Sequence, residues 1–129
     1  MLAHGTFETF AAFEPPYDEQ GGVSLVRGTF DKRFEGDLVA TSKVHILQAR
    51  TRVPGSSSYV AMERIHGTLG GRRGSFVVLH TALMGQGTRS HSIQVVPDSG
   101  THELTGLSGR MEIRVEAGER HYTLDYRFV

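Results

Sequence analysis

The stretch SYVAMERIHGTLGGRRGSFVVLHTALM, residues 58–84, decides the fold. It contains two runs rich in Val, Ile, Leu, Phe and Tyr, and a pair of glycines, Gly70 and Gly71, separates them. Glycine readily adopts the positive φ angles that a type I′ turn requires. The stretch therefore predicts a β-hairpin with strands at Ser58–Leu69 and Arg72–Met84.

The glycine turn also fixes which side chains share a face, because a slip of one residue would move every side chain to the other side of the sheet. With a two-residue turn, Glu63 pairs with Val78 and lies diagonally across from His80 on the same face. The other members of that face are mostly apolar: Tyr59, Ala61, Ile65, Phe76 and Val78. We therefore expect Glu63 and His80 to point into the protein interior.

Similar short runs fill the rest of the chain, and segments containing glycine or proline separate them. The expected strands are Gly5–Phe13, Val23–Phe34, Asp37–Arg50, Ser58–Leu69, Arg72–Met84, Thr88–Val96, Arg110–Glu116 and Glu119–Phe128. Most are linked as hairpins, and an eight-stranded meander closes on itself because closure removes its exposed edges. We predict an all-β fold: a single eight-stranded antiparallel up-and-down barrel over residues 1–129, with one helical turn in the crossing after Val96.

The last hairpin shows the clearest alternation of apolar and polar residues. A turn at Ala117 and Gly118 places Leu124 and Tyr126 on one aromatic face, with polar residues on the other. Tyr126 would then lie opposite Gly109, where the missing side chain leaves room for a ring or a ligand. We expect the aromatic face to be the inner one.

Two other turns are less decisive. A turn at Glu35 and Gly36 gives a hairpin in which neither face is plainly apolar. The loop Gly85–Gly87 has an odd number of residues, so it leaves open whether His91 or Ser92 joins the inner face.

Composition limits the function as well as the fold. The chain has 129 residues, with 14 Lys and Arg against 14 Asp and Glu, no cysteine, and no basic segment followed by an apolar run at its start. Zero net charge disfavours nucleic acid and anionic membranes as partners, and the absence of cysteine excludes disulfides and thiolate chemistry. No stretch reaches the length of a membrane span. We expect one cytoplasmic domain that binds neither membrane nor nucleic acid.

No cofactor or metal site is expected from the motifs. The seven histidines lack the paired spacing of metal ligands. The run GTLGGRRG, residues 67–74, resembles a phosphate loop, but it joins strand to strand and lacks the helix whose N-terminus would hold phosphate. It is better explained as a hairpin turn.

Residues 63–76, ERIHGTLGGRRGSF, together with FEGDL at 34–38, resemble a bacterial domain family of unknown function. Its members share the pattern ER, two residues, GTLGGR, one residue, GSF. The resemblance continues through VP at 96–97 and YTLDY at 122–126, and so covers nearly the whole chain. It implies an allene-oxide-cyclase-like barrel of the calycin type. That wider group includes cyclases and isomerases that fold a reactive substrate inside an apolar cavity.

Glu63 and His80 are the leading candidates for catalysis. An apolar enclosure raises the pKa of a carboxyl group toward neutrality, so Glu63 could act as an acid or base and His80 could relay its proton. One pairing of Val23–Phe34 with the next strand brings Arg27 to the same face. There Arg27, or the phenol of Tyr126, could stabilise negative charge that develops on a substrate.

Each candidate also has a purely structural explanation. Glu63 paired with Arg27 would fasten the barrel, and His80 bonded to a hydroxyl group such as that of Ser92 would be an ordinary wall residue. Tyr126 would then be a core tyrosine with its hydroxyl group tied.

Two functions therefore stay open. The first is a small-molecule barrel acting as a cofactor-free cyclase, isomerase or lyase on a largely apolar biosynthetic intermediate. The second is a ligand-binding or protein-interaction module without a reaction. The expected ligand contacts are Tyr59, Phe76, Val78, His91 and Leu124. Apolar residues on the outer side of Ser75–Met84, at Val77, Leu79 and Leu83, also suggest a homodimer.

Overall fold

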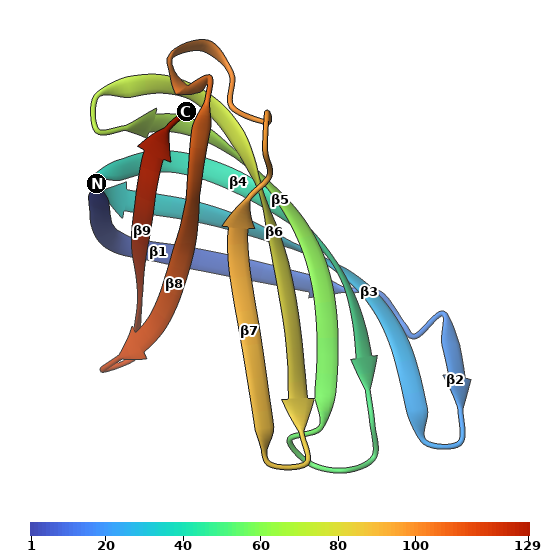
Figure 1. The fold of residues 1–129 in the computed structure, drawn as a ribbon. Helices are drawn as coiled ribbons and strands as arrows, with labels where there is room; N and C mark the ends of the chain where they lie inside the picture. Colours follow the sequence, from blue (N-terminus) through green and yellow to red (C-terminus); the bar gives the residue numbers. More distant parts are fainter.

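The computed structural model describes all residues 1–129 and confirms the all-β prediction. Its elements are β1 (Leu2–Phe13), β2 (Asp18–Gln20), β3 (Val23–Gly36), β4 (Leu38–Arg50), β5 (Ser57–Leu69), β6 (Arg72–Gly85), β7 (Thr88–Val95), the 3₁₀ turn η1 (His102–Leu104), β8 (Leu107–Glu116) and β9 (Glu119–Phe128). Figure 1 shows long, strongly curved strands wrapped around a common interior. No helix has the length and apolar character needed to span a membrane.

The barrel is an antiparallel meander of eight strands with one additional strand. Neighbours follow the order β1-β9-β8-β7-β6-β5-β4-β3, and β1 also pairs with β3, so the sheet closes. The additional strand is β2, which lies in the segment expected to be a loop. It pairs with Val23–Leu25 of β3, because β3 is long enough to hold both β1 and β2 along one edge.

Four hairpins turn through two residues that both have positive φ, as type I′ geometry requires, and one of them is the Gly21–Gly22 turn between β2 and β3. Gly70 and Gly71 have φ of 55° and 84°, and the register confirms that Glu63 pairs with Val78 and Ala61 with His80. The Ala117 and Gly118 turn likewise gives the predicted pairings of the last hairpin, including Gly109 with Tyr126.

The third such turn settles a question that the sequence leaves open. Gln86 and Gly87 form it, and Ala82 then pairs with His91 while His80 pairs with Ile93. His91, rather than Ser92, joins the inner face.

The turn predicted at Glu35 and Gly36 is wrong. Phe34 pairs with Ala40, so the hairpin is centred on Asp37 and its register differs by three residues from the prediction. An odd shift exchanges the two faces of a strand. Consequently Arg27 lies exposed on the outer side, whereas Lys32 is buried inside.

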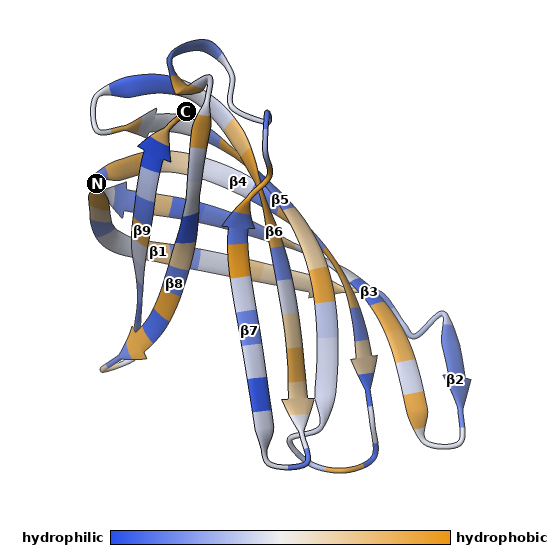
Figure 2. Cartoon of the chain, in the orientation of Figure 1, coloured by the Kyte–Doolittle hydropathy of each residue, from blue (hydrophilic) through white to orange (hydrophobic).

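The hydrophobic core fills the end of the barrel near the two termini. Sixteen buried side chains form its main cluster, and the segment carrying η1 covers that end, with Leu104 buried beneath it. Thr101 and Ser99 bind backbone groups of β6 and hold the segment in place. Figure 2 shows the alternation of hydrophobic and hydrophilic positions along the strands that produces this interior. One end of the barrel is therefore plugged.

Tyr122 joins the last strand to the β3–β4 turn. Its hydroxyl group accepts a 2.9 Å hydrogen bond from the Leu38 amide and donates to the Glu35 carbonyl at 2.9 Å. Its ring packs edge-on against Phe34 with centroids 5.6 Å apart. A side chain on Gly5 would clash with this hydroxyl and with the Glu35 carbonyl, so glycine is required there.

We predict that Tyr122→Phe lowers the free energy of unfolding by about 1–3 kcal/mol, because it leaves the buried Leu38 amide unpaired. Urea denaturation measures the change. Tyr126→Phe is the matched control, since the Tyr126 hydroxyl makes no hydrogen bond within the chain, and its effect should stay below about 0.5 kcal/mol. Equal losses in both variants would contradict the role of the Tyr122 hydroxyl.

Candidate functional site

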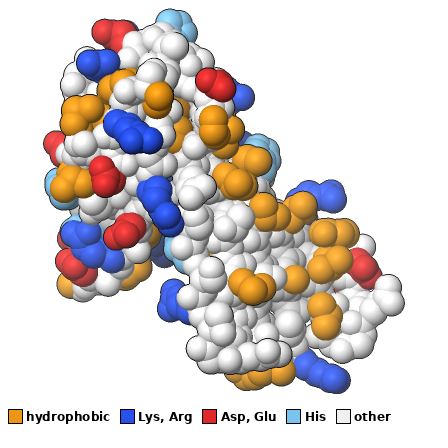
Figure 3. All heavy atoms as spheres, in the orientation of Figure 1, with side chains coloured by type: hydrophobic (Ala, Val, Ile, Leu, Met, Phe, Trp, Pro, Cys, Tyr) orange, Lys and Arg blue, Asp and Glu red, His pale blue; other side chains and the backbone are white.

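The end of the barrel opposite η1 contains a cavity of about 370 Å³. All eight strands of the barrel contribute to its wall, because the inward positions of a barrel converge on one space. Figure 3 shows a notch in the surface between the β8–β9 hairpin and β7; β7 and β8 pair only through Gln94 and Arg110. The wall consists of Phe7, Thr9, Ala11, Phe13, Phe30, Lys32, Val44, Ile46, Gln48, Tyr59, Ala61, His80, His91, Ile113 and Arg120.

A buried carboxylate lies directly behind this wall. Glu63 is fully buried, and its Oε1 atom accepts hydrogen bonds from His80 Nε2 at 2.7 Å and from Lys32 Nζ at 3.3 Å. Its Oε2 atom accepts a hydrogen bond from the Ser42 hydroxyl. Four neighbouring strands, β3 to β6, each supply one member of this network.

The surroundings of Glu63 favour its ionised form. Burial raises the pKa of the carboxyl group, and this is the largest single effect. The hydrogen bonds from His80 and Ser42 and the positive charge of Lys32 together outweigh it, so the pKa lies below its ordinary value. The expectation of a carboxyl group with a pKa raised toward neutrality is therefore wrong, because the apolar face contains a counter-ion that the predicted register places outside.

His80 is the member of the network that faces the cavity with a free nitrogen. Its Nε2 atom donates to the ionised Glu63, which has no proton to give, so in the tautomer that carries a single proton Nδ1 is the acceptor. Nδ1 has no partner in the chain and is not among the fully enclosed unpaired atoms. His80 can therefore act as a base toward a molecule in the cavity, with Glu63 orienting its ring.

Lys32 is the functional candidate that the sequence analysis missed. Its side chain is only 6% exposed, and Nζ lies 4.9 Å from the ring centre of Phe7 and 5.9 Å from that of Phe34. One of its three N–H groups binds Glu63, and the side chain also forms part of the cavity wall. The alternation of Val26, Phe30 and Phe34 was the available signal, since Lys32 shares their phase.

The expected ligand contacts divide between the two ends of the barrel. Tyr59 and His91 line the cavity, and their rings lie 6.3 Å apart. Phe76, Val78 and Leu124 are fully buried in the core at the plugged end, and none of them lines the cavity. The sequence correctly predicts that these side chains point into the barrel. It does not predict which end of the barrel they occupy.

Two expected catalytic residues lie away from the cavity. The Tyr126 hydroxyl approaches the Gly70 turn near the plugged end. Arg27 is exposed, and its guanidinium group lies 5.0 Å from the ring centre of Tyr17. The register shift at Asp37 explains the outward position of Arg27. Neither residue can serve the network around Glu63.

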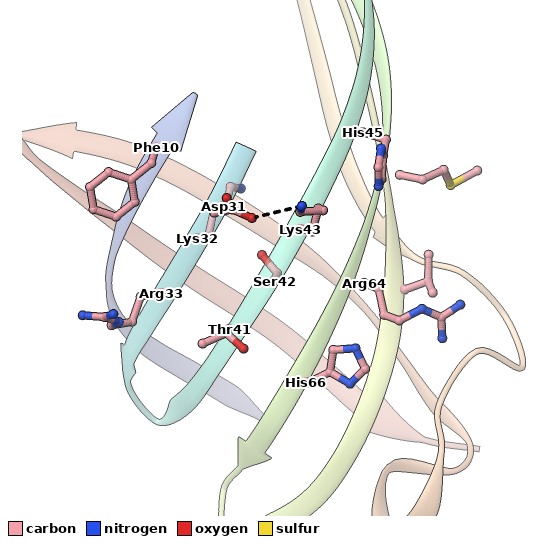
Figure 4. Close-up of a pocket in the computed structure, with 12 residues that line it drawn as sticks. Phe10, Asp31, Lys32, Arg33, Thr41, Ser42, Lys43, His45, Arg64 and His66 are labelled. Carbon is pink, nitrogen blue, oxygen red and sulfur yellow. Dashed lines mark ion pairs between the residues drawn. The ribbon is translucent and has the colours of Figure 1, made fainter. Parts of the chain in front are cut away.

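The outer surface of β3–β6 carries a separate groove of about 660 Å³, shown in Figure 4. Arg33, Lys43 and Arg64 give it a positive character, which is partly offset by Asp31, whose carboxylate lies 3.8 Å from Lys43 Nζ. A more apolar groove of about 680 Å³ adjoins it and shares His45 and Met62. Both are open surfaces rather than enclosed sites.

No group of three or more His, Cys, Asp or Glu side chains is placed to hold a metal ion. His80 and Glu63 contact each other, but their other neighbours in the network are Lys32 and Ser42.

Comparisons with known proteins identify relatives without an assigned activity. The family model described as "Protein of unknown function (DUF3224)" matches residues 3–126. The chain is also similar to the crystal structure of a protein of unknown function from the DUF3224 family of Shewanella oneidensis MR-1. That match has 41% identity and a TM-score of 0.94, and it covers 100% of this chain and 98% of that chain. No curated protein matches.

We predict that Glu63→Gln lowers the free energy of unfolding at neutral pH by about 3–5 kcal/mol, because it leaves Lys32 buried without its counter-ion. The folded-state pKa of Glu63 lies below its ordinary value of 4.5. Its contribution to stability is therefore complete above that value and is lost as the pH falls through the folded-state pKa. Urea denaturation across this range should show a flatter acid limb for the variant.

Glu112→Gln is the matched control, since Glu112 is exposed, and it should change stability by less than about 0.5 kcal/mol. The double variant Lys32→Met with Glu63→Gln should be more stable than Glu63→Gln alone, because it no longer buries an unpaired charge. A double variant less stable than the single one would show that the ion pair is not the cause.

Proposed function

Since the chain belongs to the DUF3224 family, whose members are described as proteins of unknown function, we propose a function from the barrel itself: it binds a small, largely apolar molecule in its open end. The observation that carries this proposal is the cavity with the Lys32–Glu63–His80 network at its inner wall. A cavity of about 370 Å³ lies at the lower end of the range of small-molecule sites.

The composition of the wall supports an apolar ligand. Most of the wall residues are hydrophobic, with Phe13 and Phe30 in edge-to-face contact at 5.6 Å between ring centres. Six wall residues are polar: Thr9, Lys32, Gln48, His80, His91 and Arg120. Predominantly apolar walls with a few placed polar groups are typical of ligand sites.

We further propose that the site transfers a proton, as in a cofactor-free isomerase, cyclase or lyase. His80 Nδ1 would take a proton from a carbon atom of the ligand, and Lys32 would stabilise the negative charge that develops on a neighbouring oxygen. His80 would then return the proton to a different carbon. The resemblance to allene-oxide-cyclase-like barrels fits this proposal, and we place the reaction in the cytoplasm.

The test combines the protein with a cytoplasmic metabolite extract in D₂O. We expect mass spectrometry to find a molecule that is retained through native purification and gains deuterium at carbon. His80→Gln keeps a donor for Glu63 but cannot shuttle a proton, so it should retain the molecule and label it at least about 100-fold more slowly.

Retention without labelling by the unchanged protein would leave a binding module and exclude the proton transfer. If the unchanged protein retained no molecule, the small-molecule function itself would fail. Circular dichroism of His80→Gln checks that the barrel stays intact.

We also propose that the outer grooves form a contact between two copies of the chain. The exposed apolar residues beside these grooves favour this interaction role. Leu47 and Val60 are adjacent across β4 and β5, and with Met62 they are 43–50% exposed. The positive groove beside them complements the exposed acidic arm of residues 14–19 on a second copy.

Sedimentation at high protein concentration should show a dimer for the unchanged chain and a monomer for Met62→Glu, because the variant places a charge in an apolar contact. Val115→Glu is the control, since Val115 is 65% exposed on β8 and should leave the dimer intact. A monomeric unchanged chain would refute the contact.

A further inference from the structure

The side chains of the cavity wall that can carry a charge near neutral pH are all basic. Lys32, His80, His91 and Arg120 are basic, and no Asp or Glu lies on the wall. The only carboxylate nearby is Glu63, which is fully buried behind the wall and already accepts three hydrogen bonds. A ligand therefore meets hydrogen-bond donors and positive charge but no negative group.

Thr9 supplies an independent observation. Its Oγ1 atom is the one fully buried side-chain oxygen or nitrogen without a hydrogen-bond partner, and the residue lines the cavity. A buried hydroxyl group usually finds a partner, since leaving it unpaired is unfavourable. The missing partner fits a ligand atom that accepts the Thr9 proton.

The charges around Glu63 lead to the same ligand chemistry. Two basic side chains, Lys32 and His80, share this one carboxylate, and Lys32 has two N–H groups without a partner in the chain. The pKa of His91 is consistent with a positive potential in this part of the cavity. Burial lowers this pKa, and the nearby basic groups His80, Arg89 and Lys32 lower it further. An anion on the cavity side would meet the two free N–H groups of Lys32 and the positive charge of Arg120.

We propose that the cavity binds an apolar carboxylate with its carboxylate group inward, between Lys32 and Thr9, and its hydrocarbon part toward Phe13 and Phe30. This assignment rests on the proposed small-molecule function and names the ligand class for it. It also gives the inner end of the ligand the oxygen atoms that Lys32 would stabilise during proton transfer.

The cavity volume sets the size of a suitable probe. At about 30 Å³ for a water-sized group, 370 Å³ holds roughly a dozen non-hydrogen atoms. Octanoate fits that space, and octanol and octylamine have nearly the same hydrocarbon chain with a neutral and a cationic head. The three compounds separate the contribution of the head group from that of the apolar chain.

Isothermal titration calorimetry of the full chain tests the assignment. We expect octanoate to bind at least about tenfold more tightly than octanol, as a charged acceptor with several donors would, and octylamine to bind more weakly than either. Lys32 variants risk unfolding, so Thr9→Val is the informative change. It removes a hydroxyl group that has no partner in the free protein, and so should leave the melting temperature unchanged.

Thr9→Val should weaken octanoate binding by about tenfold and leave octanol binding unchanged. Thr6→Val on the outer side of the same strand is the matched control and should affect neither ligand. Equal affinities for octanoate and octanol, with no effect of Thr9→Val, would overturn the carboxylate assignment while leaving an apolar binding site. If neither octanoate nor octanol bound, the carboxylate assignment would also be overturned. Retention of a molecule by the purified protein would then decide separately whether the small-molecule function holds.

Discussion

The structure is organised around a carboxylate that has no contact with water. An isolated buried carboxylate is unfavourable by several kcal/mol, so Glu63 requires partners that compensate for its lost hydration. Lys32, Ser42 and His80 provide them from β3, β4 and β6, which flank β5 on both sides. The network therefore depends on the register of three hairpin pairings at once. A shift of one residue in any of them would remove a partner from the inner face and leave a charge unpaired.

Hairpins with two-residue turns made much of this arrangement predictable. The Gly70 and Gly71 turn fixes its register through local backbone geometry, so the proximity of Glu63 and His80 follows from sequence alone. The turn at Asp37 carries no comparable local signal, because its register is set by β1 and by the Tyr122 hydroxyl, which are distant in sequence. Consequently Arg27 was expected where Lys32 lies. The shared phase of Phe30 and Phe34 with Lys32 was the only sequence signal against that assignment.

The alternation of residues along the strands cannot predict at which end of the barrel the cavity lies. Alternation separates inner from outer residues but does not distinguish the two ends of the interior. Here the segment carrying η1 packs Leu104 into one end, so Phe76 and Leu124 become core. At the other end small or polar residues, among them Thr9 and Ala61, occupy inward positions, and the interior remains partly unfilled. Which end stays open depends on a loop whose packing is a tertiary property.

The burial of Glu63 also determines which chemistry the cavity can offer. Glu63 takes one N–H group of Lys32 and Nε2 of His80, and it leaves the other two N–H groups of Lys32 free for a ligand. It also fixes the His80 ring through Nε2 and leaves Nδ1 as the base, while Lys32 stays charged in a largely apolar space. The carboxylate that stabilises the barrel therefore holds both His80 and Lys32 at the wall of the same cavity. Stability and reactivity share these residues, so a variant that tests reactivity without unfolding the barrel must alter His80 or Thr9 and leave the ion pair intact.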